Sequence, residues 1–197
     1  MGFREKLRDR AGSAAGEVAA WAEGRIWWWR APLLLFGGYI AVRHAADPLY
    51  TSIFGGLDLG IHEAGHLVLG WAPQFLTILG GTLFQCAAPV AAAALFVRQP
   101  DWFAVPFCGV WLADNLYGVA AYMGDARALE LPLVSVGGGE VDHDWNYLLD
   151  ALGLLEFDTA LAAAVRALAF AAMALSLAGM GWVLWTMARA KRRGGAA

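Results

Sequence analysis

Five apolar segments alternate with polar or turn-forming stretches along the chain. They cover residues 31–42, 57–71, 74–97, 102–124 and 167–187. The segment at 167–187 spans about 20 residues, which is enough to cross a bilayer as one helix. The pattern predicts an all-α fold, a polytopic membrane helix bundle with about five to six membrane segments.

The composition supports this class. Of the 197 residues, 59% are apolar and 16% are charged, and the mean hydropathy is +0.52. Such an excess of apolar surface suits a bundle of membrane helices better than a soluble domain. The net charge of −3 gives no reason to expect nucleic acid as a partner. The expected partners are the lipid bilayer and a membrane protein or peptide substrate, and the oligomeric state stays open.

Basic residues gather at both ends of the chain, which predicts that both ends face the cytoplasm. Together with the apolar segments, these basic residues predict three parts of the chain: an N-terminal cytoplasmic or interfacial segment (1–25), a membrane-embedded domain (26–188) and a basic C-terminal tail (189–197). Five full crossings would place the two ends on opposite faces. Either one segment is therefore re-entrant, or residues 146–157 dip into the membrane as an extra element.

The segment at 57–71, LDLGIHEAGHLVLGW, carries ionisable residues in an otherwise apolar run. On a helix, His62 and His66 share one face and can converge on one cation. Glu63 would lie beside that cation, where it could take a proton from water and pass it to a leaving amine. This HExxH spacing is the signature of zinc peptidases. Asp58, four residues before His62, is a candidate to accept the second ring N–H of that histidine.

The cost of polar groups in a membrane strengthens the prediction of a metal. An unpaired charge at the centre of a membrane helix costs about 2.5–3.5 kcal/mol on insertion scales. A bound Zn²⁺ would offset this cost. The alternative is a structural cluster of polar side chains, in which the ionisable residues of the segment at 57–71 pair only with one another or with Asp114.

A catalytic zinc site needs a third protein ligand and one open position. The chain has four histidines, and His44 at the edge of the first apolar segment reads as an interfacial residue. His143 is the favoured third ligand, with Asp144, Asp142 and Asp114 as alternatives. The simpler interpretation of this stretch is a solvated loop or a helix N-cap.

Asp114 and Asn115 interrupt the segment at 102–124 near its centre. An ionisable group at such a position is a candidate functional residue. Together with Asp58, Asp142 and Asp144, these two residues could support the metal ligands or contact a substrate. A plain hydrogen bond between helices explains Asn115 equally well.

The HEAGH segment in a chain with several apolar spans resembles the site-2 protease class of intramembrane zinc metallopeptidases. The resemblance implies that His62 and His66 bind zinc and that Glu63 is the catalytic acid/base. That class usually takes its third ligand from an aspartate in an LDG-like motif on a later helix. This motif is absent here, and HDWN at 143–146 occupies the corresponding stretch. The chain is also similar to small bacterial membrane proteins that pair HEAGH with HDWNYLL.

The resemblance implies a multi-pass protein of the bacterial inner (cell) membrane, with residues 26–188 as a metallopeptidase-like domain. The predicted function is zinc-dependent intramembrane hydrolysis of peptide bonds in membrane-embedded or membrane-proximal substrates. Two alternatives stay open. One is a zinc hydrolase that acts on a lipid or a small amide, and the other is a non-proteolytic metal-binding or scaffold protein.

Overall fold

The computed structural model describes residues 3–132 and 143–194, and this part of the chain contains helices and no strand. The predicted all-α class is therefore confirmed. In chain order the elements are α1 (Phe3–Ala22), α2 (Ala31–Ala46), α3 (Gly55–Val68), α4 (Gln74–Arg98), α5 (Ala104–Gly124), α6 (Asp144–Ala151), the 3₁₀ turn η1 (Leu155–Phe157) and α7 (Asp158–Gly194).

Each predicted apolar segment forms most or all of a helix, and proline helps to set two of the starts. Pro32 lies in the first turn of α2, where its missing N–H needs no partner. Pro73 directly precedes α4 and ends the turn that follows α3. Helix α7 continues through Gly194 and so includes the first residues of the predicted tail at 189–197.

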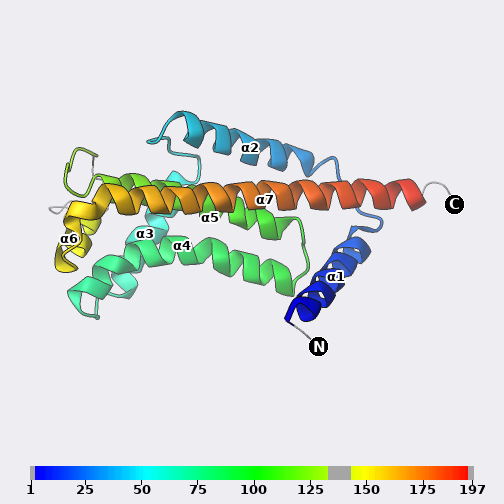
Figure 1. Ribbon diagram of the computed structural model, residues 1–197, viewed down its shortest axis with the longest axis horizontal. Coiled ribbons are helices and arrows are strands. Elements are labelled where there is room, and N and C mark those ends of the chain that lie inside the picture. Colours follow the sequence, from blue (N-terminus) through cyan, green and yellow to red (C-terminus); the bar gives the residue numbers. More distant parts are fainter. Residues whose placement is uncertain (1–2, 133–142, 195–197) are drawn as a thin grey trace.

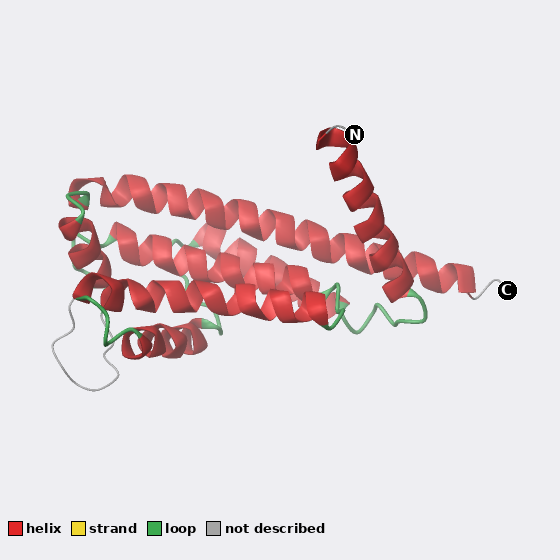
Figure 2. Cartoon of the chain, turned by 90° about the horizontal axis from the view of Figure 1, so that it is seen from below, coloured by secondary structure: helices red, strands yellow, loops and turns green. Residues whose placement is uncertain are grey.

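The helices form an elongated bundle around α5 and α7 (Figures 1 and 2). The main hydrophobic core joins α2, α5 and α7 and includes Ile40, Val110, Tyr117, Met173 and Met180. A second, smaller cluster joins the end of α5 to α6 and to the start of α7. The short helix α3 packs against α4, which in turn packs against α5.

Ion pairs mark the two ends of this bundle. At one end, Arg30 before α2 donates two hydrogen bonds, of 2.6 and 2.8 Å, to Asp101 between α4 and α5. Burial alone would raise the pKa of the Asp101 carboxyl, but the hydrogen bonds from Arg30 lower it below its ordinary value. At the other end, Arg127 donates to Asp158 at 2.6 Å and joins the end of α5 to the start of α7.

These contacts set the path of the chain. Helices α2, α4, α5 and α7 run lengthwise along the bundle (Figure 1). Helix α1 packs on the C-terminal half of α7, where Val18 and Trp21 join the core with Val183 and Met187. The first helix and the last turns of α7 therefore lie at the same end, whereas α6 lies at the opposite end.

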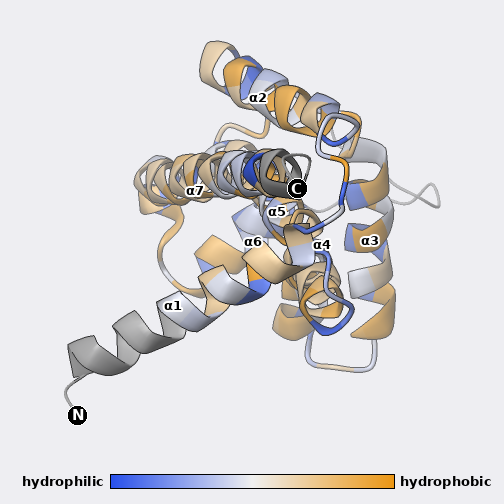
Figure 3. Ribbon diagram, turned by 90° about the vertical axis from the view of Figure 1, so that its right-hand side faces the viewer, coloured by the Kyte–Doolittle hydropathy of each residue, from blue (hydrophilic) through white to orange (hydrophobic). Residues whose placement is uncertain are grey.

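Two helices of the described residues are long and apolar enough to cross a membrane. They are Gln74–Arg98 and the continuous stretch Leu155–Ala190. Figure 3, which looks at the bundle from its right-hand end, shows hydrophobic residues on α2, α4 and α7. Helices α2 and α3, with 16 and 14 residues, are shorter than the usual span of about 20. Two of the predicted five to six membrane segments thus have the length and composition of a span.

Candidate metal centre

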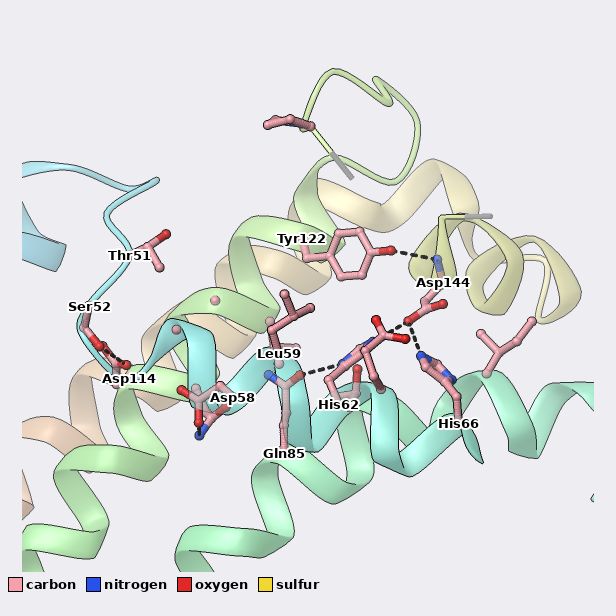
Figure 4. A pocket seen from close by; sticks show the side chains of 18 of the residues that line it. Thr51, Ser52, Asp58, Leu59, His62, His66, Gln85, Asp114, Tyr122 and Asp144 are labelled. Carbon is pink, nitrogen blue, oxygen red and sulfur yellow. Dashed lines mark hydrogen bonds and ion pairs between the residues drawn. The ribbon is translucent and has the colours of Figure 1, made fainter. Parts of the chain in front are cut away.

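Helix α3 places His62 and His66 one turn apart on the same face, as the HExxH spacing predicts. Their ring centroids are 4.7 Å apart. Both Nε2 atoms face the carboxylate of Asp144 at the start of α6 (Figure 4), and Asp144 Oδ2 lies 2.8 Å from His62 and 3.3 Å from His66. The three residues offer ligand atoms that all lie within 4.8 Å of one another. Two histidines and a carboxylate from distant parts of the chain therefore converge on one point.

The other nitrogen of each ring faces an oxygen of α4. His62 Nδ1 lies 2.6 Å from Gln85 Oε1, and His66 Nδ1 lies 2.9 Å from the backbone carbonyl of Thr77. Because these oxygens can only accept, each Nδ1 carries the hydrogen and donates it. Such a bond fixes the ring and is typical of histidines that bind metals through the opposite nitrogen.

This assignment leaves three acceptors facing one another. In the neutral rings the Nε2 atoms of His62 and His66 each present a lone pair, and Asp144 presents a carboxylate oxygen. Acceptors packed this closely repel unless a proton or a metal cation lies between them. The donor set of two histidines and one carboxylate, with a position left open, fits a catalytic zinc site.

A glycine in α4 leaves room for such an ion. A Cβ added at Gly81 would lie 2.5 Å from His62 Nε2 and 2.6 Å from His66 Nε2. The bare backbone of Gly81 therefore forms one wall of the space in front of both nitrogens. Close packing of α3 on α4 brings this wall near, because a Cβ at Gly80 would lie 2.7 Å from the backbone carbonyl of Gly65.

The candidate ligands line a cavity of about 660 Å³ that extends from α6 past α3 to the end of α2. Glu63, the predicted acid/base, lines this cavity and is only half buried. Its side chain makes no hydrogen bond to any other residue that the structure describes. The carboxylate is therefore available to a water molecule or a substrate in the cavity.

His143, the favoured third ligand in the sequence, does not join this group, and Asp144 takes its place. The His143 side chain folds back over the first turn of α6, where Nδ1 accepts the backbone N–H of Asn146 at 3.2 Å. Its Nε2 lies 3.4 Å from Asp125 Oδ2, on the side of α5. Burial lowers the pKa of the His143 imidazole, in keeping with a neutral ring whose Nδ1 accepts. Asp142 lies outside the described residues.

Asp58 does not support His62, contrary to the sequence prediction, because Gln85 takes that role. The buried Asp58 carboxylate instead accepts from Trp111 Nε1 at 2.7 Å and from Asn115 Nδ2 at 3.3 Å. This pairing explains the polar Asn115 in the middle of α5 as a bond between helices. Asp58 and Asn115 nevertheless line the same cavity as the candidate ligands.

Asp114 belongs to a second buried polar group and not to the metal centre. Its carboxylate lies 2.7 Å from His44 Nε2 and accepts from Ser52 Oγ at 2.6 Å. His44 is only 3% exposed and stacks on Tyr117, so its interpretation as an interfacial residue is wrong. These contacts tie α2 and the following turn to α5, at the end of the cavity away from α6 (Figure 4).

The sequence interpretation missed three residues of this centre: Thr77, Gln85 and Tyr122. Gln85 is a polar residue in an otherwise apolar stretch of α4, a signal that could have been read. Thr77 contributes only its backbone carbonyl to His66, which no residue-type pattern reveals. Tyr122 accepts the backbone N–H of Asp144 at 3.0 Å, a contact that depends on how α6 docks on α5.

Comparison with protein-family models, with curated proteins and with solved structures finds no match to this chain.

Proposed function

We propose that the chain is a zinc-dependent intramembrane metallopeptidase, which hydrolyses peptide bonds of membrane-embedded or membrane-proximal substrates. The observation that supports the proposal most is the convergence of His62, His66 and Asp144 on one point, with both Nδ1–H groups already engaged. Three protein ligands and an open position are the arrangement of catalytic zinc sites.

Within this proposal, His62, His66 and Asp144 hold Zn²⁺. Bound zinc supplies Lewis acidity toward a carbonyl oxygen and lowers the pKa of water. Glu63 follows the first histidine and lines the same cavity, so its carboxylate takes the proton of the attacking water and delivers it to the leaving nitrogen. The cavity of about 660 Å³ has room for an extended segment of substrate.

The outer surface of the bundle supports a membrane location. Large apolar side chains stand fully out from it, among them Leu35, Leu67, Trp71 and Leu175, each more than 70% exposed. In water such side chains would leave extensive apolar surface uncovered, whereas acyl chains cover it without cost. In this arrangement α2, α4, α5 and α7 cross the bilayer, and α3, the shortest of the five helices with 14 residues, enters it only in part.

Four crossings predict that both chain ends lie on the cytoplasmic face, in agreement with their basic residues. Fusions of green fluorescent protein to the N-terminus and to the C-terminus should both fluoresce in bacteria. Alkaline phosphatase inserted in the turn at 152–154 should be active, because that turn lies at the opposite end of the bundle. Reporters that place the two chain ends on different faces would contradict this topology.

Replacing Glu63 by Gln should separate metal binding from catalysis. The purified variant should keep about one zinc per chain, because Glu63 is outside the ligand group. Its hydrolysis of a peptide substrate in proteoliposomes should fall by about 10²–10⁴-fold, the usual contribution of a positioned acid/base. Zinc content by mass spectrometry and product formation measure the two effects.

The outcomes of this experiment distinguish the candidate functions. Full peptide hydrolysis by the Glu63→Gln variant would eliminate its acid/base role. A wild-type protein that holds zinc but cleaves only lipid or small amides would change the substrate class and keep the centre. A wild-type protein without zinc would overturn the proposal.

A further inference from the structure

The hydroxyl of Tyr122 lies beside the candidate ligands without belonging to them. Tyr122 is in the last turn of α5 and lines the cavity. Its oxygen accepts the backbone N–H of Asp144 at 3.0 Å. Figure 4 shows the phenol directed toward Asp144, across the cavity from His62 and His66. The hydroxyl therefore lies close to where a substrate carbonyl would meet the metal centre.

The ring of Tyr122 is held in place by its neighbour. It packs against His143, with ring centroids 4.1 Å apart and an angle of 39° between the planes. His143 is itself fixed, because its Nδ1 caps the first turn of α6. His143, which the sequence analysis predicts as a metal ligand, therefore has a structural role in this packing. A phenol held on one face and at its oxygen has little freedom left to lose when a ligand arrives.

The hydrogen of the Tyr122 hydroxyl has no acceptor among the described residues. A tyrosine oxygen that already accepts one hydrogen bond can still donate its own hydrogen. The bond from the Asp144 N–H also polarises the hydroxyl and makes it a better donor. A neutral donor that faces a cavity lined by several acids is matched to an incoming oxygen acceptor, such as a carbonyl.

We propose that Tyr122 is a further catalytic residue, whose O–H donates a hydrogen bond to the carbonyl oxygen of the scissile amide. The inference rests on the proposed hydrolytic function. As water adds to the carbonyl carbon, the C=O π electrons move to the oxygen, and Glu63 takes the proton of the water. Tyr122 keeps its proton and stabilises the negative oxygen. When the C–N bond breaks, the nitrogen receives the proton from Glu63, which leaves a carboxylic acid and an amine.

The test compares Tyr122→Phe with Tyr117→Phe, each of which removes one hydroxyl from α5. Tyr117 is buried, its hydroxyl has no partner among the described residues, and it lies outside the described lining of the cavity. Both variants should bind zinc as the wild-type protein does. In the cobalt-loaded protein, Tyr122→Phe should weaken binding of acetohydroxamate by about tenfold or more, as expected for loss of one hydrogen bond to a charged group. Tyr117→Phe should leave this binding unchanged.

A substrate assay adds a second measurement. Loss of one donor to the developing oxyanion should lower kcat by about 10²–10³-fold and leave KM nearly unchanged. Equal hydroxamate binding by wild type and Tyr122→Phe would overturn the role of Tyr122 alone. Lower zinc affinity with normal hydroxamate binding would also overturn it, and would make the hydroxyl a support for Asp144. A wild-type protein that takes up neither zinc nor cobalt would overturn the proposed function and this inference with it.

Discussion

Replacing Asp144 by Ala should remove the metal from the protein. Among the described residues, its carboxylate is the one candidate metal ligand outside α3 that lies near both ring nitrogens. Asp144 Oδ2 is 2.8 Å from His62 Nε2 and 3.3 Å from His66 Nε2. Zinc affinity should therefore fall by more than about 100-fold, beyond the loss seen when a partner behind a ligand is removed. Isothermal titration of the metal-free protein with Zn²⁺ in detergent measures the affinity.

His143→Ala is the matched control, because it removes the side chain of the residue directly before Asp144. His143 caps α6 and packs on Tyr122 but offers no atom to the ligand group. Loss of a helix cap costs about 1 kcal/mol, so this variant should lose at most about tenfold in zinc affinity. Complete loss of zinc in His143→Ala with retention in Asp144→Ala would restore the ligand set favoured by the sequence.

The two histidines of α3 were predictable because their relation is local. A four-residue spacing on a helix fixes which side chains share a face, whatever the rest of the fold does. The third ligand was not predictable in the same way. His143 and Asp144 are neighbours in the chain, and the point where α6 begins decides that one folds back as a cap while the other faces α3. That point depends on contacts with the turn after α5, such as the bond from Asn146 to the Ala126 carbonyl.

The partners of buried polar groups were the least predictable part of the site. Asp58 lies one turn before His62, so the sequence suggested that they pair, yet Asp58 turns to Trp111 and Asn115 on α5. Gln85 meets His62 instead because α4 packs closely on α3 through glycines. Packing between helices, which hydropathy patterns do not encode, selects among polar groups of similar reach.

The topology that we propose answers the conflict over the number of crossings by treating α3 as a partial entry into the membrane. The apolar segment at 57–71 counts as a span by hydropathy, but its helix has 14 residues and ends at Val68. At 1.5 Å per residue this helix is about 21 Å long, well short of the hydrocarbon core of about 30 Å. In the proposed topology the four longer helices α2, α4, α5 and α7 cross the membrane, and both chain ends then lie on one face.

Replacing Gly81 by Ala should abolish metal binding without weakening the fold of α4. The added methyl carbon would lie 2.5 and 2.6 Å from the two ligand nitrogens, closer than any real contact allows. One or both rings must then move away, which breaks their bonds to Gln85 or to the Thr77 carbonyl. Zinc affinity should fall by about 100-fold or more, since ligand orientation is lost together with space.

Gly60→Ala on α3 is the control, because a Cβ there would meet no atom within 4 Å. Alanine in place of glycine inside a helix gains about 1 kcal/mol in helix propensity at either position. Metal-free Gly60→Ala should therefore be at least as resistant to thermal unfolding as metal-free wild type, whereas in Gly81→Ala the lost histidine hydrogen bonds offset this gain. Only Gly81→Ala should fail to gain stability when zinc is added. Equal stabilisation of Gly81→Ala and Gly60→Ala by zinc would mean that the ion does not bind in front of the two imidazoles. Comparing the stabilisation of the two variants by zinc thus tests the position of the metal independently of any catalytic assay.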